Sequence, residues 1–152
     1  TAGLLRALEG AGARVLVNEV EEVKVAGEPV TIAGLHDPHT NFHDLDAVAR
    51  AMPPRDEPRL KIRLAHAPDP LFWAAERGFH LFACGHTHGG QICVPGWGPI
   101  SIRSPLPKRY AVGAHRIGDL HLHVSPGFGA IRAVPLRFWS RPEVTVLQLR
   151  TD

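Results

Sequence analysis

The chain has 152 residues, of which 44% are hydrophobic and 21% charged, a composition typical of a globular domain with its own core. No apolar run approaches the ~18 residues that a transmembrane helix needs, and the first residues lack the form of a signal peptide. Two cysteines, Cys84 and Cys93, are too few for a disulfide framework. We therefore expect a single domain over residues 1–152.

Charge is uneven along the chain, although the formal net charge is only +2. Residues 1–100 carry 9 basic and 12 acidic side chains, a balance of −3, whereas residues 101–152 carry 8 basic and 3 acidic ones, a balance of +5. The basic C-terminal third could face an anionic substrate, an anionic lipid or a membrane surface, or it could be a solvated arginine-rich face. No pattern predicts specific binding to nucleic acid.

Helical and strand patterns alternate over the first part of the chain. Apolar residues at helical spacing predict helices over residues 4–11, 45–52 and 70–77, and the second of these has Thr40 or Asn41 as its expected cap. Apolar and β-branched runs predict strands over residues 14–17, 20–25, 30–35, 60–65 and 79–84. The second and third strands would be joined by a turn at residues 27–29.

Strand patterns dominate the rest of the chain, over residues 110–117, 120–125 and 144–149, with Gly118-Asp119 as a hairpin turn. This order predicts a layered α/β domain whose sheet is completed by hairpins. Ligands in such folds gather at the C-terminal ends of strands.

Three histidines occupy such strand ends. His66 follows the run 62–65, and His86 and His88 lie in a glycine-rich turn that follows the run 79–83. A strand that ends in such a turn can direct both rings into one cleft, and Gly85, before the two histidines, permits backbone conformations that other residues resist. Imidazole suits zinc, iron, manganese or nickel. The pattern therefore indicates part of a metal site.

Beyond the histidines, several segments resemble the calcineurin-like metallophosphoesterases, and within them a bacterial branch of membrane- or envelope-associated phosphodiesterases. The specific segment is Gly85-His86-Thr87-His88-Gly89-Gly90-Gln91, preceded by residues 64–69. Weaker likenesses occur in the right order at residues 15–19, 31–38, 125–129, 135–138 and 141–144. The resemblance implies a metallophosphoesterase-type β-sandwich flanked by helices, and a place in the bacterial cytoplasm or at the cell-envelope periphery.

The resemblance also implies the chemistry of the site. His66 and His86 would bind the second of two divalent metal ions and His88 the first, the ions being manganese, zinc, iron or nickel. A hydroxide that bridges the two ions would attack phosphorus in a phosphodiester or phosphomonoester substrate.

The family's earlier motifs, an Asp-x-His, a Gly-Asp and a Gly-Asn-His in that order, are not found ahead of the segments that carry the resemblance. They would lie upstream of Thr1, so we expect the chain to be the C-terminal part of a metallophosphoesterase domain that lacks its N-terminal portion. No catalytic residue is assigned within it, and the chain alone is expected to be inactive.

Other interpretations remain open at this stage. Cys84, His86, His88 and Cys93 could enclose a structural zinc ion in a non-catalytic metal-binding or interaction half-domain. Asp37 and His39, in the histidine-rich segment 36–46, either contact substrate or serve the loop and a helix cap. Arg132 and Arg137 either match phosphate oxygens or pair with surface carboxylates.

Overall fold

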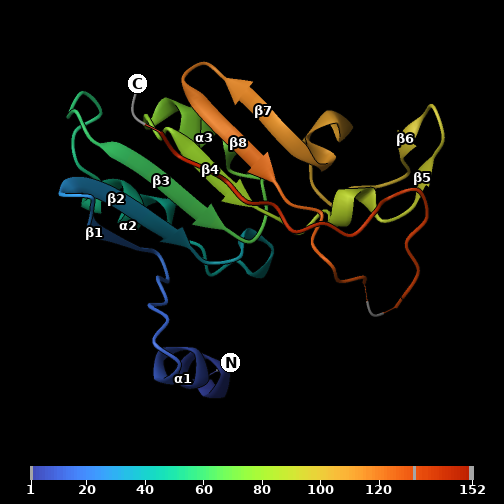
Figure 1. Ribbon diagram of the computed structural model, residues 1–152, viewed down its shortest axis with the longest axis horizontal. Coiled ribbons are helices and arrows are strands. Elements are labelled where there is room, and N and C mark those ends of the chain that lie inside the picture. Colours follow the sequence, from blue (N-terminus) through green and yellow to red (C-terminus); the bar gives the residue numbers. More distant parts are fainter. Residues whose placement is uncertain (1, 132, 151–152) are drawn as a thin grey trace.

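A mixed six-stranded sheet forms the centre of the computed structural model, which describes residues 2–131 and 133–150 (Figure 1). The spatial order is β1-β2-β3-β4-β8-β7. The four central strands run parallel, and an antiparallel strand closes each edge. The strands span Glu19–Val25 (β1), Glu28–Leu35 (β2), Leu60–Ala65 (β3), Leu81–Cys84 (β4), Gly113–Ile117 (β7) and Leu120–Val124 (β8).

A two-residue turn joins each antiparallel edge strand to its neighbour in the sheet. Val25 pairs with Glu28, so the first turn is Ala26-Gly27, and both of these residues have positive φ, +53° and +90°. Two positive φ values match the turn that best fits the twist of a hairpin. The expected turn at 27–29 was therefore placed too late in the chain. The predicted Gly118-Asp119 turn is confirmed, because Ile117 pairs with Leu120 across it.

Two helices cover one face of the sheet, α2 (Leu45–Ala51) and α3 (Leu71–Glu76). Asp44 caps α2 by accepting a hydrogen bond from the Ala47 backbone N–H at 2.7 Å, so the expected cap at Thr40 or Asn41 was wrong. The core between helices and sheet includes Val48, Leu71, Ala74, Phe82, Leu122 and Val124, each at most 1% exposed. Burial of these apolar side chains is the main contribution to the stability of the sheet at whose end His66 and His86 lie.

Short elements complete the chain. The two-stranded sheet β5 (Cys93–Val94) and β6 (Gly98–Pro99) forms a small hairpin beyond the main sheet, as Figure 1 shows. Three 3₁₀ turns lie at η1 (Pro38–Thr40), η2 (His88–Gly90) and η3 (Lys108–Ala111). The first two flank the end of the sheet at which His66 and His86 lie.

The other face of the sheet is partly covered by Leu8 and residues 13–16. Ile32, Leu64 and Ala83 line a groove on this face, and Leu64 is 45% exposed. Helix α1 (Ala2–Gly10) projects away from the sheet in Figure 1, with Leu4 65% exposed. No helix among the described residues is long and apolar enough to cross a membrane.

Two predicted strands are irregular in the structure. Residues 14–17 pass close over Gly34, so that a Cβ added to Gly34 would lie 2.4 Å from Leu16 Cβ. These residues nevertheless join no sheet. Residues 144–149 also pair with no strand, and Val146 is 89% exposed. A strand pattern becomes a strand only where a neighbour supplies backbone partners, and no described residue does so at either segment. The predicted α/β class is confirmed. A second large sheet, which a sandwich requires, is not formed by the described residues.

Candidate functional site

The ends of two adjacent parallel strands bring His66 and His86 together. Leu64 of β3 pairs with Ala83 of β4, and the Gly85 N–H donates to the His66 carbonyl at 2.9 Å. The two strands therefore end at the same level. The imidazole nitrogens His66 Nε2 and His86 Nδ1 lie 3.0 Å apart. Of the three histidines expected to converge, His66 and His86 meet, whereas no hydrogen bond or ring contact among the described residues joins the His88 ring to either. The role of all three as metal ligands stays a prediction.

The turn that carries His86 and His88 has an unusual backbone. His86, His88 and Gln91 have φ values of +71°, +51° and +55°, a region that non-glycine residues seldom occupy. Gly89 and Gly90 also have positive φ, and a Cβ on Gly90 would lie 2.1 Å from Pro99 Cβ. Such strain persists only where the surroundings enforce it, and it is frequent at functional sites.

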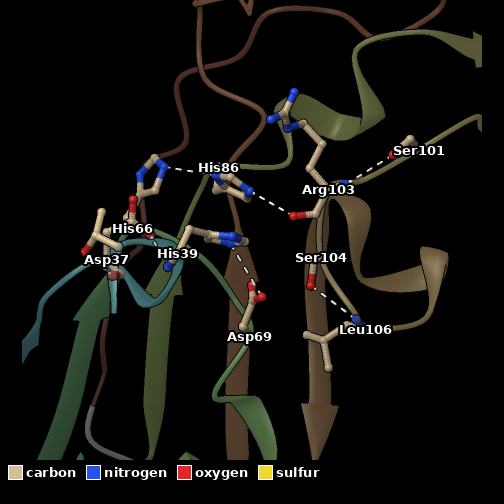
Figure 2. A network of polar contacts seen from close by, with 10 residues as sticks. Asp37, His39, His66, Asp69, His86, Ser101, Arg103, Ser104 and Leu106 are labelled. Carbon is tan, nitrogen blue, oxygen red and sulfur yellow. Dashed lines mark hydrogen bonds and ion pairs between the residues drawn. The ribbon is translucent and has the colours of Figure 1, made fainter. Parts of the chain in front are cut away.

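Hydrogen bonds fix the orientation of the His86 ring. Its Nε2 atom lies 3.0 Å from the Arg103 carbonyl oxygen, and a carbonyl can only accept, so Nε2 carries the proton. In the neutral ring this leaves a lone pair on Nδ1, directed at His66 Nε2. Figure 2 shows His86 between His66 and the Arg103 carbonyl. A ligand histidine that donates its second N–H to a backbone carbonyl is the usual arrangement at metal sites.

Burial keeps the histidines of the turn neutral. It is the main cause that lowers the pKa of His86, and the neighbouring His66 and His39 lower it further. Burial, followed by the positive charge of Arg137, also lowers the pKa of His88. Neutral imidazoles have the lone pair that a metal ion requires.

Hydrogen bonds from the Arg137 and Ser140 side chains hold the His88 side of the turn. Arg137 donates to the carbonyl oxygens of His88 at 3.0 Å and Gly129 at 2.6 Å, and the Ser140 hydroxyl donates to the His88 carbonyl at 2.8 Å. Among the described residues Arg137 contacts no carboxylate, and its side chain is half-buried. Its observed role is to tie the C-terminal segment to the turn, and the other candidate, Arg132, lies outside the described residues.

Two further residues lie at the site: His39, expected either to contact substrate or to serve its loop, and Asp69, for which the sequence predicted no role. The His39 ring stacks on the His86 ring, with centroids 4.2 Å apart and planes at 25°. Asp69 Oδ1 lies 3.5 Å from His39 Nε2. Asp37 serves the loop, as one interpretation held, because its Oδ1 accepts from the His39 backbone N–H. The sequence signal for His39 was the density of histidine and aspartate in segment 36–46, and Asp69 belongs to the segment 64–69 that precedes the histidine turn.

The described residues contain no group of three or more His, Cys, Asp or Glu side chains that could hold a metal ion by themselves. The zinc alternative loses support further, because both thiols act as hydrogen-bond donors: Cys84 Sγ to the His123 carbonyl and Cys93 Sγ to the Gly89 carbonyl. Burial raises the pKa of Cys84 to about 12 and also raises that of Cys93, which disfavours the thiolates that zinc binds.

Comparison with known proteins finds metallophosphoesterases. The chain is 36% identical over 125 residues to the uncharacterized metallophosphoesterase YkuE of Bacillus subtilis. The matched segment covers 82% of the chain and 42% of that protein. It is 34% identical over 143 residues to the phosphodiesterase YaeI of Escherichia coli, covering 93% of the chain and 49% of that protein. A transmembrane protein with metallophosphoesterase domain from Bos taurus is 30% identical over 129 residues.

The chain thus spans a little under half the length of these two bacterial relatives. No protein-family model matches it, and no solved structure gives a significant match. The similarity nevertheless runs through the strands that carry His66 and through the histidine turn, since it takes in up to 93% of the chain. The chain belongs to the metallophosphoesterase family, as part of a metallophosphoesterase domain.

Proposed function

We propose that the protein carrying this chain is a metal-dependent phosphohydrolase that cleaves phosphodiester or phosphomonoester bonds, and that His66, His86 and His88 are metal ligands. The observation that carries the proposal is the 3.0 Å approach of His66 Nε2 to His86 Nδ1 at the ends of two parallel strands. The phosphodiesterase name of one relative supports the reaction class.

The residues fit a divalent metal ion. Two imidazole nitrogens at ~2.1 Å from one ion, at right angles, lie ~3.0 Å apart. The 3.0 Å separation in the structure is that of a hydrogen bond between the two rings, so both nitrogens could bind one ion once the rings turn their lone pairs toward it and the proton between them is released. Neutral rings and the bond from His86 Nε2 to the Arg103 carbonyl favour ligation through His86 Nδ1. Imidazole donors are compatible with manganese, zinc, iron or nickel.

Two bound divalent ions would supply a hydroxide at neutral pH and neutralise the phosphoryl oxygens of the substrate. The side chains of this chain would hold the two ions and orient the groups that bind them. His66 and His86 would both bind one of the two ions, and we assign His88 to the other. Arg137 and Ser140 keep the His88 backbone in its left-handed conformation through bonds to its carbonyl. The basic balance of residues 101–152, +5 from 8 basic and 3 acidic side chains, favours an anionic substrate.

The site is completed, in this proposal, by the remaining portion of the same domain. Three neutral imidazoles cannot balance two divalent charges, so a bridging carboxylate has to come from outside the chain. The open apolar groove along Ile32, Leu64 and Ala83 is a suitable surface for a second sheet. The unpaired strand pattern at 144–149 would gain a partner in that sheet, giving the sandwich expected for the family.

The test is hydrolysis of bis-(p-nitrophenyl) phosphate by the full-length protein, with manganese and after chelation. His88→Ala should lower the metal-dependent rate by roughly 100-fold or more, because a lost ligand removes the metal or misplaces it. His121→Ala is the matched control, since His121 is exposed on β8. Circular dichroism should show the same fold in both variants. Full activity of His88→Ala, or a rate that chelation leaves unchanged, would contradict the proposal.

A further inference from the structure

His86 is held by more than its hydrogen bonds. The His39 ring, from the 3₁₀ turn η1, lies nearly parallel to one face of the His86 ring at a centroid distance of 4.2 Å. His66 meets the same ring edge-on, with centroids 4.8 Å apart and planes at 75°. The Arg103 carbonyl fixes one ring atom, Nε2. Bonds at the two ring nitrogens still allow the ring to rotate about the line that joins them, whereas a stacked neighbour fixes the plane.

Asp69 in turn holds His39. Its side chain is 15% exposed, and its Oδ1 atom lies 3.5 Å from His39 Nε2, within ion-pair distance but beyond a short directional hydrogen bond. The Oδ2 atom of Asp69 is buried without a hydrogen-bond partner among the described residues. A buried carboxylate oxygen without a hydrogen-bond partner costs folding free energy, so the presence of an aspartate at position 69 calls for an explanation. In Figure 2 the carboxylate of Asp69 points at the His39 ring.

We propose that Asp69 and His39 are positioning residues for His86: Asp69 orients the His39 ring, and the stacked His39 ring holds His86 with Nδ1 facing His66 Nε2. The inference rests on the proposed role of His86 as a metal ligand. His86 needs such support because its backbone lies in the left-handed region, at φ +71°, within a turn and not within a strand. Residues that orient a ligand in this way typically contribute 10–100-fold to metal affinity.

The stack and the carboxylate can be separated by substitution. His39→Ala removes the ring and leaves Asp69 without its contact. His39→Phe keeps a flat ring over His86 but cannot bond Asp69. Asp69→Asn keeps the shape of the side chain and removes its charge. His121→Ala is the matched control, as an exposed histidine on β8.

Manganese and zinc affinities of the full-length protein, measured by titration calorimetry, test the proposal. His39→Ala should bind either ion about 10-fold or more weakly, His39→Phe and Asp69→Asn should lose less, and the double variant His39→Phe/Asp69→Asn should lose no more than the larger single loss. Melting temperatures should stay close to that of the unchanged protein. Wild-type affinity in His39→Ala, with weakened binding in His86→Ala, would overturn the positioning role and leave the proposed function intact. Unchanged binding in His86→Ala would refute the ligand role itself.

A second measurement does not need metal. In the metal-free protein the stacked ring should shift the proton resonances of the His86 imidazole upfield, and His39→Ala should abolish this shift while His39→Phe retains it. Asp69→Asn should reduce the shift, because the His39 ring loses its orientation. His86 resonances that do not change in His39→Ala would show that the rings are not stacked, and the proposal would fail.

Discussion

His86 Nδ1 lies 3.0 Å from His66 Nε2, although 20 positions of the sequence separate the two residues. The parallel pairing of β3 with β4 accounts for this approach, because Leu64 and Ala83 pair in register and each histidine follows its strand within three residues. The sheet therefore brings the two residues together, while the loops that pack at its end orient their rings.

The chain by itself should hydrolyse bis-(p-nitrophenyl) phosphate feebly or not at all, even with manganese. It spans 42% of YkuE and 49% of YaeI, and its described residues hold no complete group of metal ligands. Adding the remaining portion of the domain, covalently or as a separate fragment, should restore turnover. Robust metal-dependent hydrolysis by residues 1–152 alone would mean that the reaction depends on groups other than those proposed.

Chelation should abolish activity of the full-length protein but leave most of its melting temperature intact. The reason is that the helices and sheet have their own apolar core, whereas a structural zinc ion contributes folding free energy directly. Cys84→Ser should cost about 1 kcal/mol, because the hydroxyl can still donate to the His123 carbonyl. If chelation unfolds the protein and Cys84→Ser has the same effect, the zinc site at Cys84, His86, His88 and Cys93 is the better interpretation.

Protonation of His80 should destabilise the fold below neutral pH. Burial lowers the pKa of His80, the ammonium group of Lys61 lowers it further, and His80 Nδ1 accepts the Lys61 backbone N–H at 3.0 Å. A histidine with a lowered folded pKa gives stability that is present above its unfolded pKa of about 6.5 and is lost as the pH falls through the folded value.

Histidine resonances followed from pH 8 to pH 5 should therefore place the pKa of His80 below 6.5. His80→Asn retains an acceptor for Lys61 but cannot titrate, so its melting temperature should fall less over this range than that of the unchanged protein. A pKa at or above the unfolded value, or identical pH profiles for the two proteins, would disprove the assignment.

Gly90→Ala should destabilise the histidine turn more than Gly96→Ala. Both glycines have positive φ, +83° and +75°, so each alanine should cost about 1 kcal/mol for the backbone. At Gly90 the new methyl group would also lie 2.1 Å from Pro99 Cβ, whereas nothing lies within 4 Å at Gly96. The clash should add about 1–3 kcal/mol, measured by urea unfolding. Equal losses at the two positions would show that the close approach to Pro99 is not rigid.

Local patterns in the sequence were sufficient for the elements whose determinants are local. The helical stripe that includes Leu45 and Val48 predicted α2, and the Gly118-Asp119 turn predicted the β7–β8 hairpin. The placement of His66 and His86 at strand ends predicted their meeting, because parallel neighbours end at a common edge of the sheet. The same patterns failed at residues 14–17 and 144–149, since β propensity cannot indicate whether a partner strand is present.

Only the tertiary structure decided which other groups reach the histidines. His39 stacks on His86 from 47 positions away, and Arg137 bonds the His88 carbonyl from 49 positions away. Neither contact leaves a periodic or spacing signal, because each depends on how separate loops pack at the end of the sheet. The sequence by itself determined which imidazoles lie at the strand ends, and the packing of η1, the Asp69 loop and the C-terminal segment determined how those imidazoles are oriented.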